Sequence, residues 1–129
     1  MSNLTSSLSD LANKLVVDIN ANTSESENVT NATAGKAYIV EIDATAGSPT
    51  TSEPACYVKI ANAQSVTGGG GSSTVPTITF YAPIGVVTTY VISNGWEFDD
   101  GLSFWCVTTA ALSGDASPTA EIKVSIVST

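Results

Sequence analysis

From residue 36 onward, apolar and polar residues alternate with a period of two, which is the pattern of half-buried β-strands. Short segments rich in Gly, Pro, Asn, Asp and Ser separate the alternating segments, and a tight turn is expected at Asn94-Gly95. The expected strands cover residues 36–44, 55–63, 76–85, 86–93, 102–110 and 120–128. Counting a short candidate strand near the N-terminus, six to seven strands predict an all-β fold, an antiparallel β-sandwich or jelly roll.

The first twenty residues have a different pattern. Apolar residues recur there at intervals of four, three, four and four, at Leu4, Leu8, Leu11, Leu15 and Ile19. This spacing predicts one stripe of a short amphipathic N-terminal helix or arm. Residues 15–19 also read as a strand, so we expect the helix to stop near Lys14. The stripe could dock on its own domain, or it could act as an arm that packs on a neighbouring subunit.

Residues 20–35 are polar and are expected to form a linker. The sequence therefore predicts two regions. Residues 1–35 form an N-terminal amphipathic helix or arm with its linker, and residues 36–129 form the β-sandwich domain.

The charge balance excludes several classes of function. The chain has no Arg, no His, four scattered Lys and twelve acidic residues, giving a formal net charge of −8. Binding to nucleic acid or to an anionic membrane draws its affinity from clustered cations, so neither is expected. Without His or Arg there is no standard catalytic triad or cationic oxyanion clamp, and we expect no enzyme and no cofactor. No signal peptide or membrane span is recognised, so synthesis in the cytoplasm is expected.

Two cysteines, Cys56 and Cys106, lie in the middle of expected strands, each on an apolar face. One reading makes them buried free thiols that act as small core residues. The other is a possible disulfide that closes a loop of roughly 50 residues and forms after release into an oxidising medium. The sequence leaves both readings open.

Several other segments are candidate binding or interface sites. The acidic segment Glu97, Asp99 and Asp100 could supply oxygen ligands to Ca²⁺, but its spacing matches no calcium loop, and an exposed turn is the stronger reading. The glycine-rich loop at 68–73 lacks the Lys and following helix of a phosphate loop. Trp96 and Trp105 are candidate interface residues, together with Leu4, Leu8, Leu11 and Leu15. For Trp105, burial in a core is the equal alternative.

Over about the last 75 residues, the order of strand and turn types resembles small β-sandwich structural proteins of tailed bacteriophages, of the capsid decoration kind. The segments that carry the resemblance are Tyr57-Val58-Lys59-Ile60, Val75-Pro76-Thr77-Ile78-Thr79-Phe80, Ala82-Pro83, Phe98, Gly101-Leu102, Phe104-Trp105, Val107-Thr108-Thr109, Leu112-Ser113-Gly114-Asp115 and Val124-Ser125-Ile126-Val127. The resemblance implies a virion structural protein that assembles, often around a threefold axis.

The expected function is therefore that of a capsid decoration or cement protein, located on the capsid surface of the virion. Its expected partners are the major capsid protein or another virion protein, and copies of itself in a homotrimer. The alternative is a receptor- or glycan-binding module at a tail or fibre tip. In that reading Trp96 and Tyr81 would stack on sugars, and the acidic segment would accept hydroxyl hydrogen bonds.

Overall fold

The computed structural model describes residues 14–22, 27, 29–30, 34–49, 53–66, 75–111 and 116–129. Within these residues the fold is all-β, without a helix, and comprises seven strands. The strands are β1 (Lys14–Asp18), β2 (Gly35–Asp43), β3 (Ala55–Asn62), β4 (Ile78–Pro83), β5 (Val87–Phe98), β6 (Leu102–Val107) and β7 (Lys123–Ser128). The predicted β-sandwich is confirmed.

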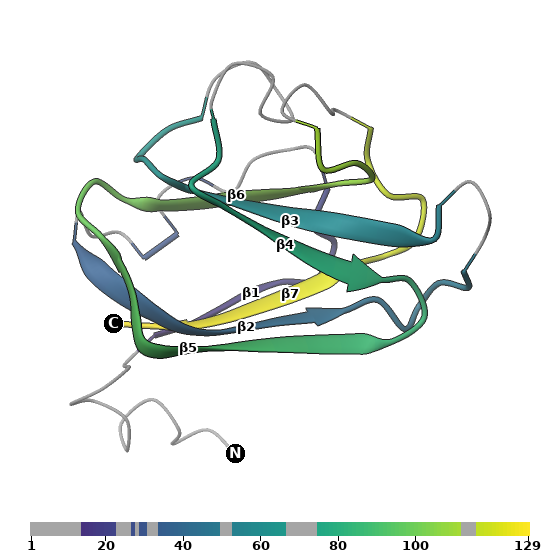
Figure 1. The fold of residues 1–129 in the computed structure, drawn as a ribbon, viewed down its shortest axis with the longest axis horizontal. Helices are drawn as coiled ribbons and strands as arrows, with labels where there is room; N and C mark the ends of the chain where they lie inside the picture. The colour runs from purple at the N-terminus through teal and green to yellow at the C-terminus, as the bar shows by residue number, and fades with distance from the viewer. Residues whose placement is uncertain are drawn as a thin grey trace.

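The strands form two antiparallel sheets that face each other (Figure 1). Sheet A has the order β1-β7-β2-β5, and sheet B has the order β4-β3-β6. Between β1 and β2, Asn22 and Val29 both bond to β6, since the Cys106 N–H donates to the Asn22 carbonyl and the Val29 N–H donates to the Leu102 carbonyl. Along the chain, β1 pairs with β7, the residues Asn22 and Val29 bond to β6, β2 pairs with β5, and β3 pairs with β4. This nested pairing is the arrangement of a jelly roll.

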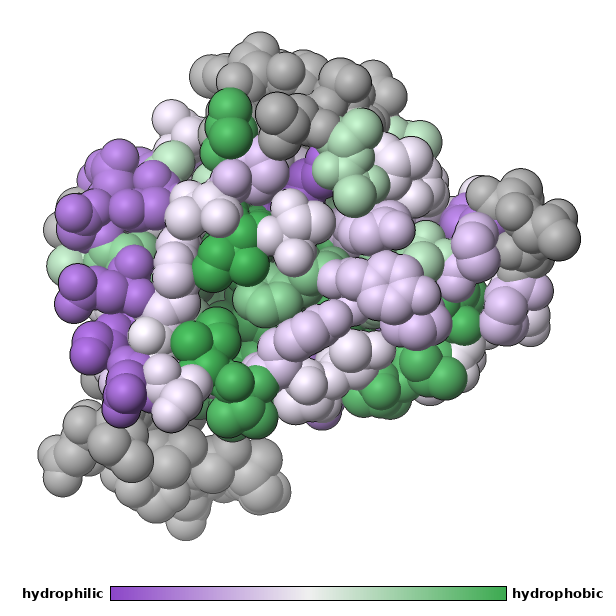
Figure 2. All heavy atoms as spheres, viewed as in Figure 1, coloured by the Kyte–Doolittle hydropathy of each residue, from purple (hydrophilic) through white to green (hydrophobic). Residues whose placement is uncertain are grey.

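The main core fills the space between the sheets. Strand β7 illustrates how the sequence builds it, since Val124, Ile126 and Ser128 are buried while Lys123 is exposed. Both cysteines belong to this core, and so do residues from six of the seven strands. Partly buried apolar side chains from β4 and β5 close the core at its open side, and Figure 2 shows hydrophobic side chains between the two layers there.

A smaller apolar cluster covers the outer face of sheet B. Trp105 and Val107 on β6 pack there with Ala61 on β3 and with Val66 from the loop that follows. Every residue of β6 is buried, because its inward side chains enter the main core and its outward Trp105 and Val107 belong to this cluster. Residues of the loop after β3 therefore help to cover the outer face of sheet B beside β6, whereas the outside of sheet A has no such cluster among the described residues.

The prediction of a tight turn at Asn94-Gly95 is wrong. Both residues have positive φ, 66° and 79°, but they lie inside β5 and the chain does not reverse there. Ile39 on β2 pairs with residue 91, and the next pair joins residue 37 to residue 96, so that residues 92–95 face a single residue of β2. Asn and Gly tolerate left-handed backbone in a bulge as readily as in a turn.

The structure tests the N-terminal predictions only from residue 14 onward. The helix predicted up to Lys14, with Leu4, Leu8 and Leu11, falls on residues outside the described part of the chain. Residues 14–18 form β1 and pair with β7, which agrees with the strand reading of this segment. The sandwich therefore begins before residue 36, and Ala21 and Thr30 of the expected linker are buried.

Candidate assembly surface and end pocket

One row of apolar side chains crosses the whole outer face of sheet A. The backbone register places Leu15 opposite Val127, Val127 opposite Ile39, and Ile39 opposite Val91. These four residues, one from each strand, alternate with residues of the core and therefore point away from it. We call them the outer row. Its two ends are the most open, since Leu15 is 47% exposed and Val91 is 75% exposed.

Polar groups flank the outer row on the same face. The next row toward the other end of the strands contains Val17, Ser125, Glu41 and Thr89. Beyond it, Asp43 pairs with Lys123 on β7 and with Val87 on β5. Hydrogen bonds from the Thr45 hydroxyl and N–H, with a smaller contribution from Lys123, hold the pKa of Asp43 below its ordinary value. Besides these polar groups the two rows hold the exposed Val17 and Val87, and we call their two carboxylates, Glu41 and Asp43, the acidic flank.

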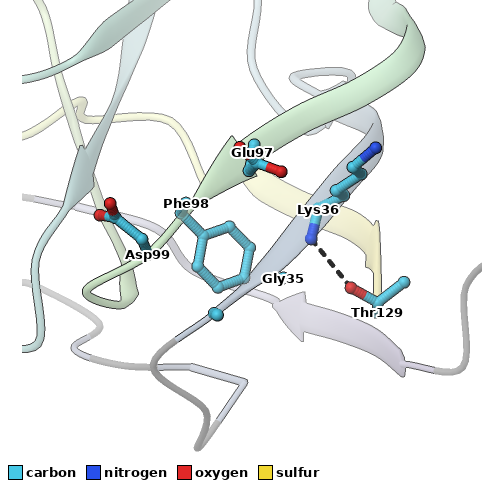
Figure 3. A pocket seen from close by; sticks show the side chains of 7 residues that line it. Gly35, Lys36, Glu97, Phe98, Asp99 and Thr129 are labelled. Atoms are coloured by element: carbon cyan, nitrogen blue, oxygen red, sulfur yellow. Dashed lines mark hydrogen bonds between the residues drawn. The ribbon is translucent and has the colours of Figure 1, made fainter.

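A pocket of about 530 Å³ lies at one end of the sandwich, beside the last residue of β5 (Figure 3). The ring of Phe98 enters it, while Lys36, Glu97 and Asp99 lie around it. The Lys36 N–H donates to Thr129 Oγ1 over 2.8 Å, and the Thr129 N–H donates to the Lys36 carbonyl over 2.9 Å, which ties the C-terminal strand to β2. The pocket is open and mostly apolar, with one cation, Lys36, and two carboxylates, Glu97 and Asp99, around it. These groups do not indicate a particular class of ligand.

The acidic segment after β5 is organised by Asn62. Asn62 Oδ1 accepts the N–H groups of Asp99, Asp100 and Gly101 over 3.2, 2.9 and 3.4 Å. Asn62 Nδ2 donates to Asp99 Oδ1 over 2.8 Å. Hydrophilic side chains gather over the end of the sandwich where β5 passes to β6 (Figure 2). Among the described residues no group of three His, Cys, Asp or Glu side chains is arranged to hold a metal ion.

The two cysteines are free thiols in this structure, and both are fully buried. They lie on the neighbouring strands β3 and β6, where Cys106 is directly opposite Val58. The hydrogen bond between the thiols, followed by burial, raises the pKa of Cys106. The same hydrogen bond lowers the pKa of Cys56 against the effect of its burial. Of the two interpretations left open by the sequence, the structure agrees with buried free thiols.

Lys59 is a buried cation on the outer face of sheet B, at 1% exposure, opposite Trp105. Its ammonium donates to the Ala111 carbonyl, and burial lowers the pKa of Lys59. The Trp105 Nε1–H, also buried, has no hydrogen-bond partner among the described residues. Trp105 belongs to the small apolar cluster and is 1% exposed, so the structure places it in the interior of the chain and not on an open surface.

The remaining candidate residues do not meet. Trp96 on β5 points toward the main core and packs 5.8 Å from Phe98, measured between ring centroids. Tyr81 on β4 lies opposite Tyr57 on sheet B, with ring centroids 5.6 Å apart, and is 49% exposed. Trp96 and Tyr81 thus belong to different sheets and form no common stacking platform. The glycine-rich loop at 68–73 lies outside the described residues.

Sequence reasoning missed three of the four outer-row residues, Ile39, Val91 and Val127. A signal was present, because each is a β-branched residue with a polar residue two positions away, on the same face of its strand. That signal shows only that each strand has an apolar residue on its outer face. It does not show that the four residues share one row, since register depends on pairing between distant segments.

No protein-family model matches this sequence, and no curated protein matches it either. No helix that could span a bilayer is found among the described residues. The fold and surface define an all-β sandwich with an apolar face on one sheet.

Proposed function

We propose that this chain is a virion structural protein of a tailed bacteriophage, and specifically a capsid decoration protein that binds the outer capsid lattice. The observation that carries the proposal is the outer row, a strip of apolar side chains on the four-stranded face of a β-sandwich. Exposed apolar strips of this kind are typical of surfaces that pack on another protein. The resemblance of residues 55–129 to small phage structural proteins supports the same class.

In this function the protein acts through buried area and number of copies. Each copy would use the outer face of sheet A as an assembly surface, and the assembled copies would bridge capsid subunits. Many weak contacts on one particle sum to strong attachment by multivalency. The net charge of −8 favours a partner surface that is positively charged, which would speed association and select the correct partner.

The first experiment is the copy number of this protein in purified particles of its source phage, measured by quantitative mass spectrometry against the major capsid protein. A lattice decoration protein is expected in hundreds of copies, in simple proportion to capsid subunits. A handful of copies would contradict this location and favour the tail or portal.

A second experiment tests the surface. Val91→Asp places a charge at the most exposed position of the outer row, and Ser93→Asp places the same charge two residues further along the same strand. We expect Val91→Asp to abolish binding to particles that lack the protein, and Ser93→Asp to retain most of it. Equal loss in both variants would show that added charge, and not the apolar row, explains the effect.

A receptor- or glycan-binding module remains a second candidate because Tyr57 and Tyr81 form an aromatic pair on sheet B, with Tyr81 half exposed. Exposed aromatic faces can stack on sugar rings. Binding on a glycan array that is lost in Tyr81→Ala and kept in Trp96→Ala would favour this candidate. A flat array would remove it.

A further inference from the structure

We propose that the outer row of sheet A is the docking site for residues 4–11 of a second copy of this chain. In this arrangement Leu4, Leu8 and Leu11 of one copy cover the outer row of the next, and the contact links copies head to tail. This inference rests on the proposed function in one respect, namely that the outer face of sheet A is an assembly surface. It adds the identity of the segment that occupies that face within the protein's own oligomer.

The first argument is the match in length. Four strands spaced about 4.8 Å apart place the two ends of the outer row about 14 Å from each other. A helix over residues 4–11 would be about 12 Å long at 1.5 Å per residue. Its apolar stripe, with one leucine per turn, would therefore extend over nearly the full row from Leu15 to Val91.

The second argument is charge. Residues 1–13 contain one acidic residue, Asp10, out of the twelve in the chain, and no Lys. A segment with so little charge can approach the acidic flank of sheet A without strong repulsion. Direct pairing of two sheet faces is less favourable, because it would bring the Glu41 and Asp43 carboxylates of both copies into one interface.

The third argument concerns reach and favours a second copy over the same copy. Residue 13 directly precedes β1, the edge strand whose Leu15 ends the outer row. Three peptide units join Leu11 to Lys14, and they span about 10–11 Å when fully extended. A layer packed on a sheet lies about 10 Å above it, so nearly the whole connection would be used in rising from the edge. If residues 4–11 instead extend away from β1 onto a neighbouring copy, the length of the connection does not restrict their position.

Contacts of this kind are heterologous, since each copy offers one stripe and one row. Such contacts close into a ring when the rotation between copies allows it. The trimer that the resemblance to phage structural proteins implies is one such ring, and each copy in it would have both its stripe and its outer row buried.

The test uses full-length protein and two complementary variants. Leu8→Asp/Leu11→Asp removes the apolar stripe and leaves the outer row intact. Val91→Asp alters the outer row and leaves the stripe intact. The matched controls are Ser7→Asp, beside the stripe, and Ser93→Asp, beside the row. Circular dichroism verifies folding, and Val91→Ser replaces Val91→Asp if the charged variant does not fold.

Light scattering coupled to gel filtration then reports the mass of each species. We expect the wild-type chain and both controls at three times the 13.1 kDa of one chain, and each variant alone at the mass of one chain. An equimolar mixture of the two variants should form a heterodimer, because the intact stripe of one binds the intact row of the other.

Two results would overturn the inference. A monomeric wild-type chain would exclude docking between copies. Variants that do not combine on mixing would show that the stripe binds its own chain or that copies pair by another surface. Failure here is separate from failure of the proposed function, which is judged by copy number on particles. A monomer that decorates capsids would refute only the docking, and a complementing oligomer absent from capsids would refute only the decoration.

Discussion

Asn62 on β3 and Asp99 after β5 are joined by hydrogen bonds in both directions. The Asn62 amide donates to the Asp99 carboxylate over 2.8 Å, and the Asp99 N–H donates to Asn62 Oδ1 over 3.2 Å. The residues are 37 positions apart in sequence. Since the same Oδ1 also accepts from Asp100 and Gly101, one side chain of sheet B orders the connection by which the chain passes from sheet A to sheet B.

The first prediction concerns this connection. Asn62→Ala should lower the free energy of unfolding by about 1–2 kcal/mol, because several backbone N–H groups lose their acceptor and regain only part of it from water. Urea unfolding monitored by tryptophan fluorescence measures the change. Gln64→Ala, at an exposed position two residues further along, serves as the control. An equal and small change in both variants would show that solvent replaces Asn62 fully.

The second prediction concerns the buried cation. Lys59→Met keeps most of the apolar stem and removes an ammonium group that burial disfavours. We expect it to raise the free energy of unfolding at neutral pH by about 1 kcal/mol, since replacement of a buried charge by an apolar group is often stabilising. Lys123→Met, at an exposed position on β7, should have little effect. A large loss of stability in Lys59→Met would show that the bond to Ala111 outweighs desolvation.

The pH dependence provides a separate check on Lys59. Its pKa is lower in the folded chain than the ordinary value of 10.5, so the unfolded chain binds the proton more tightly. The free energy of unfolding therefore rises with pH from the folded pKa up to 10.5. We expect this rise to be smaller in Lys59→Met than in the wild type when both are unfolded in urea across the alkaline range.

A third prediction concerns Glu53, which holds the loop before β7. Its carboxylate accepts the Thr119 N–H and hydroxyl and the Ala120 N–H. Partial burial acts to raise the pKa of Glu53, but these hydrogen bonds outweigh it and lower the pKa below 4.5. The stabilisation is thus present above pH 4.5 and is lost as the pH falls through the lower, folded value.

Glu53→Gln should therefore cost a fraction of a kcal/mol at neutral pH and nothing once the wild-type carboxylate is protonated, since much of the group is open to solvent. Thermal unfolding of both chains from neutral to acidic pH measures the difference. Glu121→Gln, at an exposed position nearby, is the control. A difference that persists unchanged in acid would contradict a role for the carboxylate charge.

The fourth prediction concerns the thiols. Cys56 and Cys106 are fully buried, so neither should react with a colourimetric thiol reagent in the folded protein. Both should react once the chain is unfolded in denaturant without reductant. Fewer than two thiols under those conditions, in protein kept in an oxidising medium, would mean that a disulfide forms between them.

The β-strands could be predicted because their signal is local. The expected strand at 36–44 corresponds to β2 (Gly35–Asp43), and that at 55–63 corresponds to β3 (Ala55–Asn62). Alternation within one strand depends only on which side chains face the core. Asn94-Gly95 was interpreted incorrectly for the opposite reason. Its left-handed backbone suits a hairpin turn or a bulge equally, and the pairing of β5 with β2 decides between them.

The candidate contacts were predicted less well. Trp105 has apolar neighbours on both sides in sequence, which a buried strand and an interface strand share. Its burial depends on loops that fold over sheet B and contribute Val66 to the cluster above it. The role of Asn62 could not be predicted from the sequence. A single Asn at the end of a strand is common, and the three backbone N–H groups that it accepts lie almost forty residues away.

By itself, the sequence determined that the chain is all-β, where most of its strands lie, and that it contains no Arg, no His and only four Lys. These properties depend on composition and on patterns within single segments. Only the tertiary structure decided that Leu15, Val127, Ile39 and Val91 form one row. A shift of one residue in any strand pairing would turn that strand's residue into the core, and the register of pairs so distant in sequence is set by the packing of the whole sandwich.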